Sequence, residues 1–332
     1  MKPVALVTGE VSPYRIEPFR MLAEQEGVEV IAFDDDGELE AARRILAGRY
    51  RAVIHGLGGR VSLPAAYAAA RRARIPFVLW ASLWAHPRTP AHLLSWVPTR
   101  HLYRRADAVV TYGPHVSRYV QRIRGTRGNV FEAPQAVSAE QFGGPVTPRR
   151  VTQGFELLFV GRLEREKGIE VLLEAWRLAD LGDGATLALA GQGRIRPQGK
   201  NVLTLGPIRR EELPPLYAGA DALVLPSIRT ATFLEPWGLV VNEAMHQGTP
   251  VIASDAVGAV AGGLVRDGRN GLVAPAGDVR ALATRIQAIA ADRGLRERLG
   301  AAAREDVGEF SEAAWVAGMR HALNAVGAGS GR

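Results

Sequence analysis

Two glutamates in the second half of the chain, Glu235 and Glu243, stand eight residues apart in a segment whose pattern predicts a helix over about 237–247. The preceding apolar run predicts a strand that ends at Pro226, so this helix would begin after a loop at the edge of a sheet. The first N–H groups of such a helix have no intrahelical acceptor and lie at the positive end of its dipole, which favours phosphate. Helical rise would place the two carboxylates roughly 12 Å apart. Their oxygens could then accept hydroxyl groups at two ends of an extended ligand.

Two cations stand in a second segment of the same kind. Residues 157–161 predict a strand and residues 168–179 a helix, which puts Arg162 and Lys167 in the loop at the carboxyl end of that strand. Open parallel sheets bind their ligands at this edge. A guanidinium and an ammonium there could neutralise a diphosphate without a metal. The alternative is a surface role, in which Glu235 only charges a helix start and the other three side chains face solvent.

The elements that must position these residues follow from a regular alternation of strand-like and helical patterns. Both halves of the chain show it, and it is typical of parallel α/β sheets. Ten short apolar runs predict strands over 4–7, 28–33, 52–54, 77–80, 108–110, 157–160, 186–190, 202–205, 222–225 and 251–253.

A stretch over 143–154 contains glycines and prolines and has no apolar period, so it predicts a linker between two domains. We therefore expect a first domain over 1–145 and a second over 152–308. A helix predicted over 309–326 could pack back toward the first domain.

The composition agrees with two globular domains. The chain has 332 residues, of which 47% are hydrophobic and 23% charged, enough to form two cores. It has no cysteine, which excludes disulfides, a thiolate nucleophile and sulfur-bound zinc. The first apolar run is too short for a signal peptide, and prolines and polar residues interrupt the longer run over 77–97. We expect a cytoplasmic protein.

The net charge of +7 belongs to the first half of the chain. Residues 1–150 hold 21 Lys and Arg against 13 Asp and Glu, and residues 41–130 hold 16 Arg against one acid, Asp107. Such an excess of positive charge favours an anionic partner: a phosphorylated substrate, an acidic lipid surface or nucleic acid. The alternative is that the arginines only form a solvated surface. Aromatic rings beside cations are typical of a membrane interface, so one hypothesis is peripheral contact with the inner membrane face. The alternative hypothesis is a soluble acceptor. The rings are Trp80, Trp84 and Trp96.

Residues 155–278 resemble the retaining glycosyltransferases of family 4. The matching pieces occur in order and with the right spacing: GRLEREKG, the AGQG turn, LGPIRREELPPLYAGADALVLPS, EPWGLVVNEAM and DGRNGLVAPAGD. The resemblance implies the GT-B fold, with two facing Rossmann-like, doubly wound domains and a cleft between them. It also implies that the first domain, 1–145, binds the acceptor and that the second, 152–308, binds the nucleotide-sugar donor. It further implies metal-independent transfer of a sugar from a nucleotide-sugar to a hydroxyl-bearing acceptor. The acceptor could be a glycan, a lipid-linked compound or a small molecule, and the reaction would belong to bacterial polysaccharide or glycoconjugate synthesis.

The resemblance also implies roles for individual residues. Glu235 would contact the donor sugar as a catalytic residue, and Glu243 would bind the ribose. Arg162 and Lys167 would hold the diphosphate, and Ile208 would flank the nucleobase. Main-chain groups at the helix start would bind the sugar at Trp237 and the diphosphate at Gly238, Leu239 and Val240.

The first half matches the family less closely, because the loop after its first strand, TGEVSPYR, has one glycine. The resemblance implies that Gly9 lets this backbone approach the diphosphate. The family's cleft histidine follows a strand of the first domain, and His55 and His86 compete for that role. We prefer His86, which lies in a long loop at the matching place in the chain. Gly191 and Gly193 are expected only to allow a tight turn.

Other classes of protein are less consistent with the sequence. A dinucleotide oxidoreductase would need G-x-G-x-x-G after the first strand, which TGEVSPYR lacks. A sugar-nucleotide epimerase or hydrolase shares the two-domain fold and stays an alternative, as does a non-catalytic nucleotide-sugar-binding protein. We expect no nucleic acid, no metal and no cofactor, only a UDP-, GDP- or ADP-linked co-substrate. The acidic run 34–36 is expected to be a solvated loop, and His246 to be structural.

Overall fold

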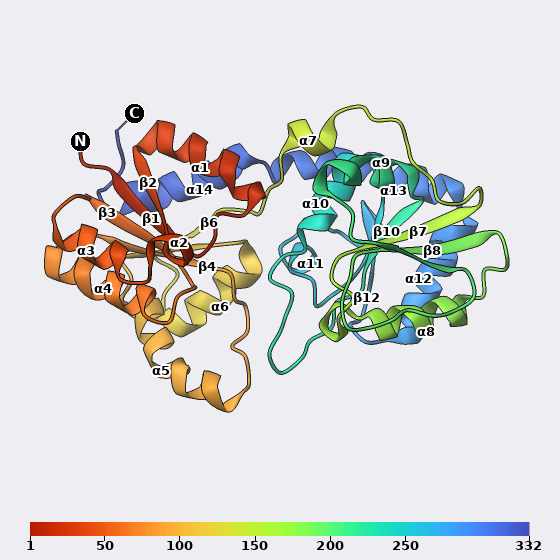
Figure 1. The fold of residues 1–332 in the computed structure, drawn as a ribbon, viewed down its shortest axis with the longest axis horizontal. Coiled ribbons are helices and arrows are strands. Elements are labelled where there is room, and N and C mark those ends of the chain that lie inside the picture. The colour runs from red at the N-terminus through yellow and green to blue at the C-terminus, as the bar shows by residue number, and fades with distance from the viewer. Residues whose placement is uncertain (332) are drawn as a thin grey trace. The chain divides into compact units, whose positions relative to one another are not determined.

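The computed structural model describes residues 1–331, apart from the side chains of residues 90–93. The chain forms two compact units, each built on its own sheet (Figure 1). The first unit contains residues 1–136 together with the chain from 312 onward, and the second contains residues 137–311. Among the described residues, no helix is both long enough and apolar enough to span a bilayer.

Six parallel strands form the sheet of the first unit, in the order β2-β1-β3-β4-β5-β6. The chain therefore winds outward in both directions from β1, and the switch point of this doubly wound sheet lies between β1 and β3. The strands are β1 (Val4–Thr8), β2 (Val28–Ala32), β3 (Ala52–Gly56), β4 (Phe77–Ala81), β5 (Ala108–Thr111) and β6 (Val130–Glu132).

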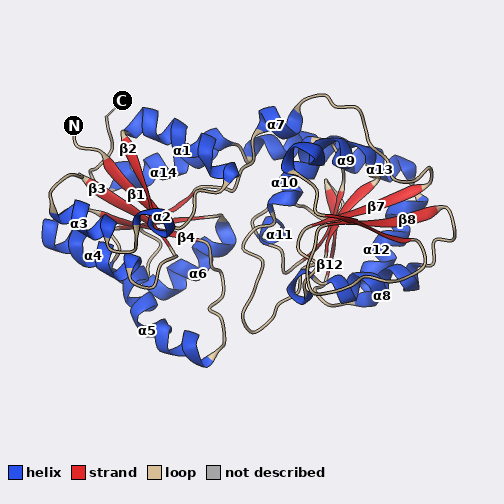
Figure 2. Cartoon of the chain, in the orientation of Figure 1, coloured by secondary structure: helices blue, strands red, loops and turns tan. Residues whose placement is uncertain are grey.

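Helices cover both faces of this sheet (Figure 2). On one face, Phe19 of the first helix and Trp315 of the last one pack against Leu6 and its neighbours. On the other face, Tyr103 and residues of four further helices pack in one cluster with Leu79. The C-terminal helix thus completes the first unit. The helices are α1 (Pro13–Glu26), α2 (Phe33–Asp36), α3 (Glu40–Leu46), α4 (Ser62–Ala73), α5 (Pro90–Arg105), α6 (Pro114–Arg124) and α14 (Glu312–Ala325).

The sheet of the second unit also has six parallel strands, in the order β12-β11-β10-β7-β8-β9. Counted within the unit, this is the 3-2-1-4-5-6 order of Rossmann sheets, with the switch point between β7 and β10. The strands are β7 (Phe155–Val160), β8 (Ala185–Ala190), β9 (Val202–Gly206), β10 (Ala222–Leu225), β11 (Val251–Ser254) and β12 (Gly271–Ala274).

The helices of the second unit pack in two groups. One group pairs α8 with α12, and the other places α10 against α9 and α13. The elements are α7 (Ala139–Gly143), the 3₁₀ turn η1 (Arg165–Lys167), α8 (Ile169–Ala179), η2 (Arg210–Glu212), α9 (Leu213–Gly219), α10 (Leu239–His246), α11 (Gly258–Ala261), α12 (Val279–Ala291), α13 (Arg293–Asp306) and η3 (Val307–Glu309).

All ten predicted strands are present, with ends shifted by no more than two residues. Their near-continuous apolar runs follow from burial on both faces of a parallel sheet. The edge strands β6 and β12 escape prediction because β6 is short and partly exposed and β12 begins with a glycine. The prediction of a loop over 34–36 is wrong, because these acids form the end of the one-turn helix α2.

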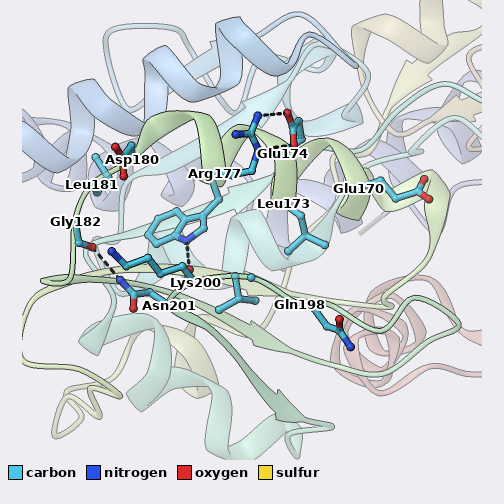
Figure 3. Close-up of a pocket in the computed structure, with 13 residues that line it drawn as sticks. Glu170, Leu173, Glu174, Arg177, Asp180, Leu181, Gly182, Gln198, Lys200 and Asn201 are labelled. Carbon is cyan, nitrogen blue, oxygen red and sulfur yellow. Dashed lines mark hydrogen bonds and ion pairs between the residues drawn. The ribbon is translucent and has the colours of Figure 1, made fainter.

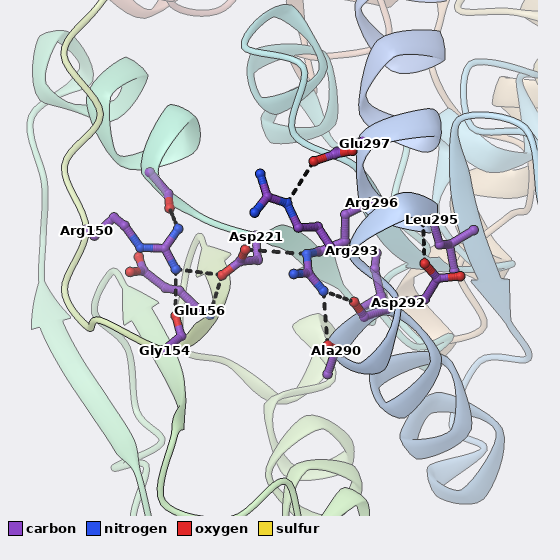
Figure 4. A network of polar contacts seen from close by, with 12 residues as sticks. Arg150, Gly154, Glu156, Asp221, Ala290, Asp292, Arg293, Leu295, Arg296 and Glu297 are labelled. Carbon is purple, nitrogen blue, oxygen red and sulfur yellow. Dashed lines mark hydrogen bonds and ion pairs between the residues drawn. The ribbon is translucent and has the colours of Figure 1, made fainter.

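The segment 143–154, expected to link the domains, lies inside the second unit. Arg150 donates to the Gly219 carbonyl at 2.7 Å and to Asp221 Oδ2 at 2.6 Å. Figure 4 shows Arg150 and Arg296 on either side of Asp221. The Nε atom of Arg296 lies 3.4 Å from Asp221 Oδ1. Because of its prolines and glycines this segment has no apolar periodicity, which led to the prediction of a linker. Side-chain hydrogen bonds nevertheless hold it to the second sheet.

Candidate functional site

The candidate site of the second unit lies at its topological switch point. There the loop after β7, with Arg162 and Lys167, is next to the loop after β10, with Glu235, because β7 and β10 are paired neighbours. Doubly wound sheets bind their ligands at this place. The strand order thus brings together two segments that the sequence shows only as separate motifs.

Lys167 and Glu235 form a buried ion pair. Lys167 Nζ donates to Glu235 Oε2, and Ser227 Oγ donates to the same oxygen at 3.0 Å. Glu235 is 6% exposed, and the Lys167 side chain is 15% exposed. Removing one member of such a pair leaves the other charge desolvated, so the two side chains act as a unit. An ammonium has three donors, so Lys167 can bind an anion while it still holds Glu235.

Two serines of the site were not predicted from the sequence. Ser227 follows β10 and is buried, and Ser254, which ends β11, donates its hydroxyl to the Ser227 carbonyl. Ser254 therefore fixes the backbone that carries the Ser227 hydroxyl bonded to Glu235. Both serines end apolar strand runs at the ligand edge, but serine is common wherever a strand gives way to a turn, and this signal is weak.

Close backbone contact fixes the two loops against each other. Gly168 has φ +74°, and a Cβ at this position would overlap the Pro226 carbonyl oxygen. The Ile228 N–H donates to the Glu166 carbonyl at 2.9 Å. The Glu166 carboxylate in turn pairs with Arg162 at 3.0 Å, and the Arg162 side chain stays 60% exposed. Lys167 is therefore positioned by a rigid turn, whereas Arg162 remains accessible to a ligand.

The two glycines of the AGQG turn are required by a close contact between loops, which the sequence did not predict. A Cβ on Gly191 would overlap the Gly161 carbonyl oxygen, and a Cβ on Gly193 would overlap the Leu163 carbonyl oxygen. The Leu163 N–H also donates to the Gln192 carbonyl at 2.9 Å. These glycines let the loops after β7 and β8 touch, so their role extends beyond a tight turn.

The helix at the site, α10, begins at Leu239, two residues later than predicted. Gly238 precedes it with φ +94°, and no side chain caps the helix start. The main-chain N–H groups of Leu239 and Val240 therefore lie in its first turn, where a phosphate could accept from them. The Trp237 side chain is 2% exposed and donates from Nε1 to Asn242 Oδ1 at 2.7 Å, so it belongs to the core. Only the main chain of Trp237 could reach a ligand.

Glu243 lies in α10, and its distance from Glu235 is not a helical rise, because the intervening residues up to Gly238 are not helical. The estimate of the carboxylate separation therefore does not apply. Glu243 is 7% exposed and accepts from the Tyr217 hydroxyl at 2.7 Å. Burial raises the pKa of the Glu243 carboxyl, while the Tyr217 hydrogen bond acts to lower it. Tyr217 is a second residue that the sequence did not reveal.

Two other predicted positions lie at the edges of this region. Ile208 follows β9 and is half-buried, and the Gly206 carbonyl just before it accepts from the Gly191 N–H at 2.8 Å. The loop of Ile208 is therefore next to the AGQG turn. His246 ends α10 with its ring beside Gly143, and burial lowers its pKa, which fits a structural side chain.

The first unit has a pocket of about 450 Å³ at its own switch point, between the ends of β1 and β3. Gly9 lines this pocket, and a Cβ at Gly9 would lie 2.9 Å from Asp34 Oδ2 and 3.5 Å from the Phe33 ring. Packing against α2 is therefore a sufficient reason for glycine at this position. The approach of Gly9 to a diphosphate stays a prediction.

The two histidines that compete for the cleft role differ in surroundings. His55 is fully buried in β3, with its ring nitrogens 2.7 Å from the Gly56 carbonyl oxygen and 3.0 Å from Ser62 Oγ. Burial lowers the pKa of His55 to about 4, so it is a neutral core residue near neutral pH. His86 lies in the loop after β4, half-buried, with its ring centroid 4.7 Å from that of Trp96. These surroundings favour His86, whose catalytic role stays a prediction.

The tryptophans of the basic region do not form the exposed aromatic surface that the sequence indicated. Trp80 is 6% exposed, and Trp84 and Trp96 are half-buried. Exposed apolar side chains occur instead on α5, where Leu94 and Val97 are 83% and 73% exposed. The spacing of aromatic residues among arginines did not distinguish rings at strand ends, which enter the core, from surface rings.

A second cavity, of about 470 Å³, is shown in Figure 3. It lies beside α8, lined by Glu170, Arg177 and the loop 198–202, where the Lys200 carbonyl accepts from Trp176 Nε1 at 3.2 Å. No predicted site residue lines it, so it is separate from the switch point. Within the described part of the chain, no group of three or more His, Asp and Glu could hold a metal ion.

Comparison with known proteins finds a matching family model within the second unit. Residues 148–306 match the family model of the glycosyl transferases group 1. Glycogen synthase of Mycobacterium tuberculosis is 31% identical over 217 residues, which cover 61% of this chain and 50% of that protein. The sulfoquinovosyl transferase SQD2 of Arabidopsis thaliana is 27% identical over 289 residues, which cover 78% of this chain and 53% of that protein. The chain thus spans about half the length of these curated relatives.

Solved structures match nearly the whole chain. Sucrose-phosphate synthase from Thermosynechococcus elongatus has a TM-score of 0.77 at 22% identity, covering 99% of this chain and 100% of that one. HepE from Anabaena, solved with UDP and glucose, has a TM-score of 0.73 at 20% identity, covering 98% of this chain and 100% of that one. At these identities the likeness shows the fold, so the prediction of a GT-B fold with two Rossmann-like domains is confirmed.

Proposed function

We propose that this chain, whose residues 148–306 match the family model of the group 1 glycosyltransferases, transfers a sugar from a nucleotide-sugar to a hydroxyl-bearing acceptor. The observation that carries the proposal is the buried pair of Lys167 and Glu235 at the switch point of the second unit, beside the start of α10. A cation, a carboxylate and helix-start N–H groups suit the phosphate and the sugar hydroxyls of one ligand. HepE, which shares the fold, was also solved with UDP-glucose.

The residues of the second unit divide among the parts of the donor. Lys167, Arg162 and the first turn of α10 would bind the diphosphate, because all three present positive charge or N–H donors. Glu235 would accept hydrogen bonds from the hydroxyl groups of the sugar. Glu243 would accept those of the ribose, and Ile208 would pack against the base. This division also follows the family resemblance, which covers each of these positions.

We propose that the transfer retains the configuration at C1 of the sugar. The acceptor oxygen attacks C1 from the face on which the diphosphate departs. The bond from C1 to the phosphate oxygen breaks with its electron pair staying on the diphosphate, and the acceptor proton passes to that departing oxygen. No protein nucleophile enters this scheme, which agrees with Glu235 Oε2 being held by Lys167 and Ser227. Lys167 and Arg162 would stabilise the charge that develops on the leaving group.

We propose further that side-chain cations, rather than a metal, neutralise the diphosphate. Two positive side chains at the site can supply that neutralisation. Turnover should therefore be unchanged in EDTA when measured with saturating donor. Loss of turnover in EDTA that magnesium or manganese restores would contradict the proposal.

The experiment that tests the function is a panel of UDP-, GDP- and ADP-sugars, measured first by thermal shift and then by product analysis. A ligand that binds only the folded state raises the unfolding temperature and thus identifies the donor. Sugar transfer that occurs only when an acceptor is present would support the transferase. Free sugar or an epimer formed without acceptor would indicate a hydrolase or epimerase, and binding without any product would indicate a non-catalytic protein.

We propose in addition that the first unit contacts the inner face of an anionic membrane. The exposed Leu94 and Val97 lie on α5, whose second half exposes Arg100, Arg104 and Arg105. Apolar side chains that enter the interface next to arginines that meet lipid phosphate are a known mode of peripheral binding. If the vesicle experiment described in the Discussion finds no binding, a soluble acceptor is the better hypothesis.

A further inference from the structure

Arg15, in the first turn of α1, is a buried cation without an acidic partner. The residue is 4% exposed and forms no ion pair with any described carboxylate. Its Nη2 donates to Gln135 Oε1 and, at 3.5 Å, to the Tyr112 hydroxyl. Four aromatic rings surround the guanidinium carbon, with centroids 4.4 Å away for Trp80, 4.9 Å for Tyr14, 5.6 Å for Trp315 and 5.8 Å for Tyr112.

These neighbours do not neutralise Arg15. Aromatic faces attract a cation through their quadrupoles, but they carry no net charge. A buried charge without a counter-charge is unfavourable, and arginine cannot lose its proton in a protein. The Nε and Nη1 groups of Arg15 hydrogen-bond to none of the described residues, and Arg15 lines the pocket of the first unit. An anion in this pocket would supply both the missing charge and the missing acceptors.

The position of the pocket agrees with a ligand site. It lies at the switch point between β1 and β3, where a doubly wound sheet of this order binds its ligand. The start of the 14-residue helix α1 lines it through Ser12 and Tyr14, and the Ser12 side chain does not cap the helix. The positive end of a helix dipole and a buried guanidinium therefore point to the same kind of ligand.

Two carboxylates narrow the class of ligand. Glu10 and Asp34 also line the pocket, and both are exposed, whereas Arg15 is buried. Carboxylates repel an anion but accept hydroxyl groups well. A ligand that fits both ends carries hydroxyl groups toward Glu10 and Asp34 and an anionic group toward Arg15. A neutral sugar would leave the buried charge unpaired.

We propose that this pocket binds the acceptor of the transfer, and that Arg15 binds a phosphate or carboxylate group of that acceptor. The acceptor is then a polyhydroxyl compound with an anionic substituent. The term acceptor rests on the proposed glycosyltransferase function, whereas the anion site itself does not. Arg15 is a binding residue in this scheme and takes no part in bond making.

The test titrates the 332-residue chain by calorimetry with three probes: glucose 6-phosphate, glucuronate and uncharged glucose. We expect the two anionic probes to bind at least tenfold more tightly than glucose. Arg15→Met should remove this difference, and Arg15→Lys should keep part of it, because an ammonium retains the charge but loses the planar fork. Equal affinities of all three probes for the unmodified protein would overturn the proposal.

Because Arg15 is buried, Arg15→Met could unfold the protein, and a second variant avoids this difficulty. Ser12→Asp places a negative charge in the pocket at a position where aspartate is a good helix cap. It should weaken the anionic probes at least tenfold while the unfolding temperature stays within a few degrees. Arg20→Met is the matched control, since Arg20 lies on the exposed side of α1 with Glu17 and Glu24, and it should change nothing. Unchanged probe binding in Ser12→Asp would also overturn the proposal.

A further experiment decides whether the anion bound by Arg15 belongs to the acceptor or to the diphosphate of the donor. Arg15→Met should leave the affinity for the nucleoside diphosphate of the identified donor unchanged, whereas Lys167→Ala should weaken it at least tenfold. An equal loss in both variants would assign Arg15 to the donor and overturn the acceptor proposal. If no nucleotide-sugar binds the unmodified protein, the transferase function fails, but binding of the anionic probes at Arg15 is still tested by the same titrations.

Discussion

At the scale of single residues, the ion pair of Lys167 and Glu235 is the part of the site that substitution tests most directly. We predict that Lys167→Ala and Glu235→Gln each lower kcat at least tenfold, which corresponds to about 1.4 kcal/mol of transition-state stabilisation. Lys167 would lose its contact with the departing diphosphate, and Glu235 would lose charge next to the sugar. Steady-state kinetics with the donor found by the nucleotide-sugar panel measure both effects.

Lys200→Ala is the control for this prediction. The Lys200 side chain is 68% exposed and pairs with Asp183 at 2.7 Å, away from the switch point, so turnover should stay unchanged. Far-UV circular dichroism of all three variants checks that the fold is intact. Normal kinetics in both Lys167→Ala and Glu235→Gln would remove the basis for the site assignment.

The sequence reveals some of these residues and not others, for physical reasons. Lys167 and Glu235 stand out because charged residues directly after apolar strands are visible in the spacing. Ser227 and Tyr217 do not, because their importance lies in hydrogen bonds to Glu235 and Glu243 that depend on the folded backbone. Arg15 lies in a motif that the sequence does show, but nothing local indicates that three aromatic rings distant in the chain, besides that of Tyr14, surround it.

At the scale of elements, the contact between the loops after β7 and β10 depends on Gly168. We predict that Gly168→Ala destabilises the protein more than Gly182→Ala does. Both positions have positive φ, +74° and +76°, so both alanines cost roughly 1 kcal/mol of backbone strain. Only Gly168 has a carbonyl, that of Pro226, in the space of the new Cβ. Urea unfolding should therefore give a larger loss of unfolding free energy for Gly168→Ala, and equal losses would contradict the contact.

A carboxylate clamp between α13 and the loop before β12 gives a pH-dependent prediction. Asp306 accepts from Arg269 at 2.7 and 2.8 Å and from Asn270 at 2.8 Å, and it is 3% exposed. The Arg269 hydrogen bonds hold the pKa of Asp306 below its usual value. Its contribution to stability is therefore complete above the usual carboxyl pKa and is lost as the pH falls through the lowered one.

We predict that Asp306→Asn lowers the free energy of unfolding by about 2 kcal/mol at pH 7. The difference from the unmodified protein should shrink between about pH 5 and pH 2, as the carboxyl becomes protonated. Chemical unfolding at a series of pH values measures it. Asp183→Asn is the control, because the Asp183 side chain is 88% exposed and a surface pair contributes little. A difference that does not change with pH would exclude the ionic clamp.

The elements themselves were largely predictable, but their order in the sheets was not. Strands buried on both faces produce apolar runs that the sequence shows plainly, whereas the edge strand β6 has three residues and little burial. No local pattern states that β7 pairs with β10, and this pairing is what places Lys167 beside Glu235. The family resemblance supplied that information only indirectly, through the implied fold.

At the scale of the whole chain, the first unit is built from two stretches that are far apart in the sequence, which composition does not indicate. The C-terminal helix α14 joins the first unit, where Trp315 packs against Phe19 with 5.7 Å between ring centroids. The glycine- and proline-containing segment after Val137 belongs to the second. A domain boundary drawn at the change of composition therefore falls inside a unit, because side-chain hydrogen bonds and helix packing decide where a segment belongs.

The uneven distribution of charge gives the last prediction, which concerns the membrane. The basic excess lies in the first half of the chain, and α5 there exposes Leu94 and Val97. We predict binding to vesicles that contain phosphatidylglycerol and none to pure phosphatidylcholine. Binding should weaken with salt, because the Debye length falls from about 8 Å at 0.15 M to about 3 Å at 1 M. Sedimentation of the protein with vesicles at the two salt concentrations measures this.

Substitution distinguishes insertion of α5 from general attraction of a basic protein. Leu94→Asp adds a negative charge and removes an apolar contact at the most exposed of these positions, so it should abolish vesicle binding at 0.15 M salt. Leu203→Asp makes the same change on the second unit, where Leu203 is 41% exposed, and it should have little effect. If both variants bind like the unmodified protein, charge alone attracts it to the lipid. If the unmodified protein binds no anionic vesicle even at low salt, its acceptor is soluble, and the arginines of the first unit serve solvation.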